Sequence, residues 1–348
     1  MDRRNNFDAL RLLAASSVIF THAFLLAEGT QDRDPLVILS LHQCPTGLVG
    51  VFVFFAISGF LVTQSWEQTN SLPRFLAKRA LRIYPGLAAC ILVLTFGLGA
   101  AMTSLPLGDY LRDPGTHEFL GANLLMQLQP NSLPGVEFSK YWFGTVLDGP
   151  LWSLPLEASL YLMVAALGMA RLIRLPVLAV LLVVGLLSVW FDKWIDANLA
   201  LGFLAGVGWM LGFFVTGMAL YKLRDRGVFN GRLALLAVLG VVLSVPLQSF
   251  IPMFAVFGCY LALYAALHPS LPIIPAARFG DLSYGLYIYG WPVEQTVSYL
   301  RPGASWWELF LISMVATAGV AFLSWHLVEK QALGFKPRGA RSAKPAPA

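Results

Sequence analysis

Residues 7–24 read FDALRLLAASSVIFTHAF, an apolar stretch that nevertheless carries an arginine, Arg11, and a histidine, His22. It is long enough to begin a membrane-spanning helix, which needs about 20 mostly apolar residues. Basic residues precede it, as in a signal peptide, but Arg11 interrupts the apolar run and no A-x-A cleavage site follows. We therefore interpret this stretch as an uncleaved first membrane span.

Similar apolar runs recur along the whole chain. Of its 348 residues, 57% are hydrophobic and 12% are charged, whereas a soluble domain carries about 25% charged residues. The sequence predicts an all-α, polytopic transmembrane helix bundle of about ten spans. The expected spans are 7–27, 46–66, 83–104, 151–171, 175–191, 199–221, 233–249, 251–268, 281–300 and 306–328.

The distribution of positive charge predicts how these spans are oriented. With the N-terminus in the cytoplasm, 18 of the 24 Lys and Arg residues fall in cytoplasmic segments, five fall in outer segments, and Arg11 lies within the first span. Cytoplasmic loops of membrane proteins carry such an excess of positive charge. We expect both termini to be cytoplasmic, with one transmembrane domain over 1–330, an outer loop at 105–150 and a disordered, basic tail at 331–348.

The two polar groups of the first span share one face. Eleven residues separate Arg11 from His22, which leaves them ~20° apart after three full helical turns. Asp8 lies one turn before Arg11 and is expected to pair with it. Arg11 could simply extend to the lipid headgroups, and His22 could make only a hydrogen bond between helices. The shared face favours a joint functional role, because ionisable groups within spans usually line a cavity or a pathway.

Two glutamates are expected at the depth of His22. Glu157, in the fourth span, and Glu294, in the ninth, each lie ~9 Å from the outer edge of their spans, and His22 lies ~8 Å from it. Tyr161 follows Glu157 by four residues and shares its face. Three titratable groups at one level suggest a buried polar chamber, unless the glutamates face the outer loop and only cap helices. The role of Glu294 stays open.

A basic cluster precedes the third span. The stretch RFLAKRALRIYPGL (74–87) places Lys78, Arg79 and Arg82 at helical neighbour spacings. Such a fork suits phosphate oxygens. Contact with lipid headgroups is the alternative interpretation.

The ninth span begins DLSYGLYIYGWP (281–292), in which Ser283 and Tyr287 share a face and Tyr284 is adjacent. Membrane-interface aromatic belts explain some of these tyrosines. A polar Ser/Tyr stripe in a span that enters from the cytoplasm could also line a cofactor tunnel.

Other chemistry finds little support in the chain. The sequence contains no GxxxxGK, GxSxG, HExxH or CxxC motif. The three cysteines, Cys44, Cys90 and Cys259, form no spacing pattern, so we expect neither a disulfide nor a metal site.

Five of these segments, taken in order, resemble the membrane acyltransferase 3 family over nearly the whole chain. They are RNNFDALRLLAA followed by THAF, GVFVFFAISGFLV, the RxxR pair with the Tyr-Pro that follows it, LWSLPLEASLY, and LSYGLYIYGWPVEQ. The resemblance implies an integral membrane O-acyltransferase of the bacterial inner membrane. It would move an acyl group, by default acetyl, from cytoplasmic acetyl-CoA to a hydroxyl of a surface or exported polysaccharide such as O-antigen or exopolysaccharide.

The resemblance also assigns roles to residues. The family's first-span histidine and arginine match His22 and Arg11, its RxxR pair matches Arg79 and Arg82, and its WSL-x-x-E glutamate matches Glu157. Many members have a histidine before Trp-Pro in the ninth span, where this chain has a glycine, Gly290. A mechanism that needs that second histidine is therefore in doubt.

These observations combine into a hypothesis. His22 acts as the general base for the acceptor hydroxyl, and Glu157 orients it or relays protons. Arg79 and Arg82, with Lys78, hold the CoA phosphates, and Arg11, paired with Asp8, lines the pantetheine path or steadies the oxyanion. Trp152, Ser153 and Tyr161 shape the acceptor side, and Ser283, Tyr284 and Tyr287 shape the donor tunnel.

The alternative from another class is a proton-coupled transporter or flippase of a sugar or lipid-linked precursor. In it, His22, Glu157 and Glu294 would relay protons or bind a solute without covalent chemistry. The absence of an inverted repeat in the sequence argues against it.

Overall fold

The computed structural model describes residues 5–336 except 70, 128–130, 140–142 and 196–198, and within 190–205 it describes the backbone only. Arg3 and Arg4, which contribute to the predicted charge asymmetry, and most of the predicted tail lie outside the described residues. All regular elements in the described part of the chain are helices.

Ten apolar helical segments form the body of the protein, one in each predicted span. They are α1 (Phe7–Glu28), α3 (Thr46–Thr69), α4 (Leu72–Leu92), α8 (Ser153–Met169), α9 (Leu175–Ile195), α10 (Leu199–Leu223), α11 (Gly231–Ser244), α13 (Cys259–Leu267), α14 (Ser283–Leu300) and α15 (Trp306–Ser324).

Three of these helices are continued by π-helical turns. Val93–Gly99 joins α4 to α5 (Ala100–Met102), Phe254–Gly258 joins α12 (Phe250–Met253) to α13, and Trp325–Glu329 joins α15 to α16 (Lys330–Gly334). The last of these shows that the predicted disordered tail is wrong in its first residues, because 331–334 are helical.

Seven helical segments among the described residues are long and apolar enough to cross a membrane. They are Phe7–Glu28, Thr46–Thr69, Leu72–Met102, Gly149–Met169, Gly206–Arg226, Phe250–Leu267 and Trp306–Gly334. The apolar helices Leu175–Val189 and Gly231–Ser244 are shorter, and α14 is the tenth segment. The protein is thus a helical membrane protein, while ten crossings and cytoplasmic termini stay predictions.

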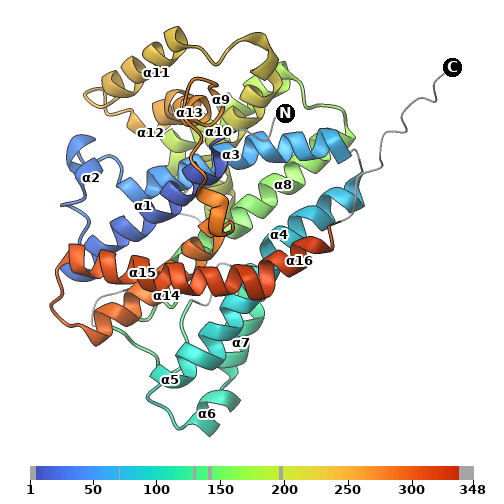
Figure 1. Ribbon diagram of the computed structural model, residues 1–348. Coiled ribbons are helices and arrows are strands. Elements are labelled where there is room, and N and C mark those ends of the chain that lie inside the picture. The colour runs from blue at the N-terminus through green and yellow to red at the C-terminus, as the bar shows by residue number, and fades with distance from the viewer. Residues whose placement is uncertain (1–4, 70, 128–130, 140–142, 196–198, 337–348) are drawn as a thin grey trace.

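The helices pack in a chain of neighbours, α9–α10–α3–α1–α14–α15, with α4 and α8 beside them. In Figure 1, α5, α6 (Leu107–Arg112) and α7 (Pro114–Leu124) project from one end of the bundle, and α16 lies against α4. The predicted outer loop is therefore partly helical. It is tied to the bundle, since Tyr110 donates a hydrogen bond to the Thr95 carbonyl (2.7 Å).

The central contact, between α3 and α10, depends on two glycines. A Cβ atom at Gly59 would lie 1.9 Å from the carbonyl oxygen of Phe214, and one at Gly217 would lie 2.0 Å from that of Ala56. No real Cβ approaches a backbone atom so closely, so each helix exposes bare backbone to the other. Small residues allow this approach between membrane helices.

We expect Gly59→Ala to lower the free energy of unfolding by about 1–3 kcal/mol or more, because the added methyl must push two backbones apart. Thermal unfolding of the purified protein in detergent measures the effect. Gly319→Ala is the matched control, since nothing lies within 4 Å of a Cβ at that position of α15. Equal stability of the two variants would contradict the packing described here.

Candidate active site

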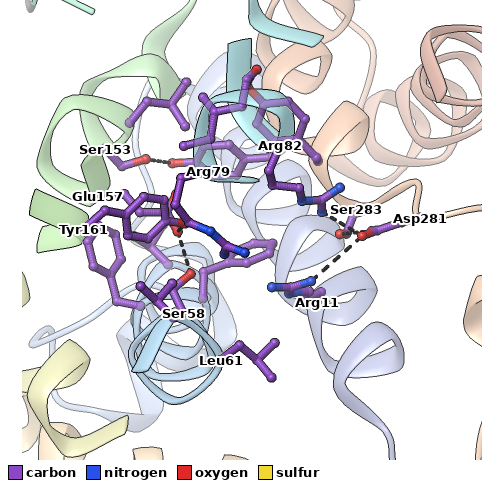
Figure 2. Close-up of a pocket in the computed structure, with 18 of the residues that line it drawn as sticks. Arg11, Ser58, Leu61, Arg79, Arg82, Ser153, Glu157, Tyr161, Asp281 and Ser283 are labelled. Carbon is purple, nitrogen blue, oxygen red and sulfur yellow. Dashed lines mark hydrogen bonds and ion pairs between the residues drawn. The ribbon is translucent and has the colours of Figure 1, made fainter. Parts of the chain in front are cut away.

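A cavity of about 380 Å³ is lined by three arginines, Arg11, Arg79 and Arg82. We call the end of the bundle that holds them the basic end. The walls of the cavity come from α1, α3, α4, α8, α14 and the segment that follows α15. Figure 2 shows polar side chains converging on it. The predicted residues that line this first cavity are Arg11, Arg79, Arg82, Ser153, Glu157, Tyr161, Ser283, Tyr284 and Tyr287. The structure thus brings together most of the predicted donor residues.

Asp281 organises the basic end. Its carboxylate lies 2.6 Å from the Arg82 guanidinium and 3.8 Å from that of Arg11, and it accepts a hydrogen bond from Ser283 (2.6 Å). Removing one partner of such a pair leaves a poorly solvated charge behind, which is costly in an apolar setting. The predicted partner of Arg11, Asp8, is instead exposed and does not line the cavity.

The predicted fork of three cations is only partly assembled. Lys78 does not line the cavity and donates to the Thr69 hydroxyl (2.7 Å) instead. Arg79 lies over the ring of Tyr161, 5.8 Å from its centroid, and Arg82 lies over that of Tyr284 at 5.7 Å. Arg79 and Arg82 therefore face the cavity, and Lys78 faces away from it.

Glu157 belongs to this first cavity. Its carboxylate accepts hydrogen bonds from the hydroxyls of Ser58 and of Tyr161, the latter at 2.6 Å. Tyr161 was predicted on the acceptor side, but it lines the cavity that holds the arginines.

His22 lines a second, smaller cavity of about 180 Å³. Trp152, Gln31 and Pro150 also line it, as do Val51 and Tyr287, which line the first cavity too. Val51 and Tyr287 therefore form the wall shared by the two cavities, which we call the junction. The Tyr287 hydroxyl is hydrogen-bonded to that of Ser153 (2.6 Å) and donates to the Pro150 carbonyl (3.1 Å).

The carboxylate beside His22 is that of Glu294. Its Oε2 lies 3.4 Å from Nδ1 of His22, and the Glu294 side chain is fully buried. The indole of Trp291 packs edge-on against the imidazole, with centroids 4.8 Å apart. The pairing of His22 with Glu157 is thus corrected, although Glu294 carried a signal in its matching depth.

A polar network fixes the helix turn that holds His22. The neighbouring residue, Thr21, donates to the buried carboxylate of Asp34, which also accepts from the backbone and hydroxyl of Thr46 at the start of α3. The Thr21 oxygen in turn accepts from the Gly47 amide (2.7 Å). Sequence reasoning missed both Asp34 and Asp281. Asp281 carried one usable signal, as an acidic residue at the start of a predicted span.

Gly290 packs against the first helix. A Cβ at this position would lie 3.0 Å from Cγ1 of Ile19, so any larger side chain requires the Ile19 side chain to shift. A histidine at 290 would therefore need a different arrangement of Ile19.

Comparison with known proteins identifies the family. Residues 4–326 match a family model described as an acyltransferase domain. The chain belongs to the acyltransferase 3 family. This acyltransferase is 30% identical over 345 residues to the O-acetyl transferase of Shigella phage Sf6, covering 96% of this chain and 97% of the relative. It is also 30% identical to Nodulation protein 10 of Rhizobium leguminosarum bv. viciae, covering 95% and 93%. No solved structure matches the chain significantly.

The predicted family resemblance is therefore confirmed, and the protein is an enzyme that transfers acyl groups. The transporter alternative accounts for none of these matches. An acyl donor follows from the family, whereas the nature of the donor and acceptor is a question for the chemistry of the two cavities.

We expect Asp281→Asn to lower the free energy of unfolding of the acyltransferase by about 3 kcal/mol, because it leaves the Arg82 guanidinium without its carboxylate. Unfolding in detergent, followed by tryptophan fluorescence, measures this. Asp225→Asn is the control, since Asp225 also pairs with an arginine, Arg224, but its side chain is 81% exposed and such pairs contribute little. A loss of similar size in both variants would contradict the role of Asp281.

Proposed function

We propose that the protein is an O-acyltransferase that moves an acyl group, by default acetyl, from acyl-CoA to a hydroxyl of a polysaccharide sugar. The observation that carries the proposal is that two different cavities lie side by side and share Tyr287 as a wall. One is lined by arginines, and the other holds a histidine beside a buried carboxylate.

The first cavity suits the donor. Acyl-CoA is an elongated molecule with phosphates at one end and a thioester at the other. Arg79 and Arg82 offer guanidinium donors for phosphate oxygens. The apolar and hydroxyl side chains farther in, with Ser153 and Tyr287 at the junction, accommodate the pantetheine arm and deliver the thioester to the second cavity.

The second cavity suits the acceptor. Trp152 is 36% exposed there and offers an aromatic face for a sugar ring. His22 lines the same cavity, so a sugar ring that stacks on Trp152 would place its hydroxyls near the imidazole. The similarity to a relative named O-acetyl transferase supports an oxygen acceptor and an acetyl group.

The chemistry follows from this arrangement. His22, with Nδ1 beside Glu294, takes the hydroxyl proton at Nε2 as the acceptor oxygen attacks the thioester carbonyl carbon. The carbon–oxygen bond forms, the carbon–sulfur bond breaks, and CoA leaves as a thiolate. The proton taken from the hydroxyl stays on His22. Glu294 keeps the imidazole in the right tautomer and stabilises its protonated form, as a third group does in catalytic triads.

Arg11 is better suited to the donor than to the oxyanion. Eleven residues of α-helix separate it from His22, a rise of ~16 Å, so both side chains cannot contact the same reacting carbonyl. The hydroxyls of Ser153 and Tyr287 lie at the junction, and we assign them the oxyanion, which they stabilise when they exchange their bonds to each other and to the Pro150 carbonyl for bonds to the oxyanion.

His22→Ala tests the general base. We expect the rate of acetyl transfer to fall by about 10²–10⁴-fold, the usual contribution of general base catalysis. The assay follows labelled acetyl-CoA in membranes and counts label on surface glycan, at matched protein levels. His117→Ala, an exposed histidine in α7, is the control, and normal transfer by His22→Ala would overturn the assignment.

Glu294→Gln tests the positioning residue. The amide keeps the shape of the side chain but cannot stabilise the protonated imidazole, so we expect kcat to fall about a hundredfold while the KM for acetyl-CoA stays unchanged. Glu294→Asp should restore part of the rate.

Because Glu157 lines the donor cavity, Glu157→Gln should raise the KM for acetyl-CoA. If Glu157→Gln lowers kcat and Glu294→Gln does not, Glu157 and not Glu294 acts together with His22.

A further inference from the structure

The segment that follows α15 forms part of the wall of the first cavity. Trp325 in the π-helical turn, Leu333 in α16 and Lys336 just beyond it line the cavity together with the arginines. Figure 1 shows α16 alongside α4, the helix that carries Arg79 and Arg82. A cation from the C-terminal segment thus joins the basic end.

Close packing holds this segment in place. Glu329 is 3% exposed and accepts a hydrogen bond from Ser324 (2.9 Å). A Cβ at Gly86 of α4 would lie 3.2 Å from the Glu329 carboxyl carbon and 2.7 Å from the ring of Tyr284. Gly86 therefore lets the turn approach α4 closely, which sets where Lys336 emerges.

Only some of the cations that line this cavity have a carboxylate partner. Asp281 pairs with Arg82 and Arg11, whereas neither Arg79 nor Lys336 takes part in an ion pair among the described residues. Loss of solvation beside the cavity wall, and then the positive charges of Arg82 and Arg79, lower the pKa of the Lys336 amine. A bound anion would relieve this repulsion.

We propose that Lys336 binds the 3′-phosphate at the nucleotide end of the acyl-CoA donor, with Arg79 binding the diphosphate deeper in the cavity. This rests on the proposed function. The thioester must reach the junction at Tyr287, so the nucleotide end stays at the opening. Lys336 is exposed there, while the Arg82 side chain is only 18% exposed and already paired.

The test removes the 3′-phosphate from the donor and the Lys336 amine from the protein, separately and together. Affinities of acetyl-CoA and of acetyl-3′-dephospho-CoA are measured by calorimetry on the full-length protein in nanodiscs of neutral lipid. We expect Lys336→Ala to weaken acetyl-CoA about tenfold, as for a lost charge-assisted hydrogen bond, and to leave acetyl-3′-dephospho-CoA unchanged. Lys336→Arg should bind both donors nearly as wild type does.

Lys330→Ala is the matched control, because Lys330 is an exposed lysine of α16 that does not line the cavity. An equal loss for both donors in Lys336→Ala, or no loss for either, overturns the assignment while the proposed function stands. If the wild type binds neither donor, the proposed function itself fails.

A lipid headgroup offers the same phosphate chemistry, and a second arm separates the two sources. The measurement is repeated in nanodiscs that contain anionic lipid. If the effect of Lys336→Ala appears only there, and is the same for both donors, the lysine binds lipid and the proposal is overturned.

Discussion

One carboxylate determines how the basic end of this bundle is built. Asp281 draws together Arg11 from α1 and Arg82 from α4, and it does so at the start of α14. Guanidinium groups within a membrane-embedded bundle need such a counter-ion. Because two arginines share a single acid, the cavity retains net positive charge, and the cations that Asp281 does not contact remain able to meet an incoming anion.

The sequence predicts the helical segments better than it predicts which residues meet. Hydropathy locates all ten helical segments, but of the three groups predicted at one level only His22 and Glu294 lie together, because Glu157 contacts Ser58, about 16 Å along α3 from the Gly47 that contacts Thr21. Helical rise does not say that α1 packs against α14 along its length, which is what puts Glu294, and not Glu157, beside the imidazole. Charge spacing likewise picks out the basic cluster but not which cations face inward, because the rotation of α4 depends on its packing.

The departure at Gly290 has a physical counterpart in the same helix. The Ile19 side chain packs against Gly290, 3.0 Å from where a Cβ would lie, and α1 and α14 are in extensive contact. Glu294 lies one turn farther along α14 on the same face, and this turn brings an acid to the ring of His22. In this chain a carboxylate and a single imidazole therefore form the polar pair between these helices.

The hydrogen bond between the hydroxyls of Tyr287 and Ser153 has a consequence for the permeability of the membrane. A wide, water-filled passage through a membrane enzyme would let ions leak and would discharge the proton gradient. Between the two cavities of this structure stand the Ser153 and Tyr287 side chains, which are hydrogen-bonded to each other, and Tyr287 is also bonded to the Pro150 carbonyl. Such a barrier would let an acyl group pass from one cavity to the other without opening a continuous path for ions.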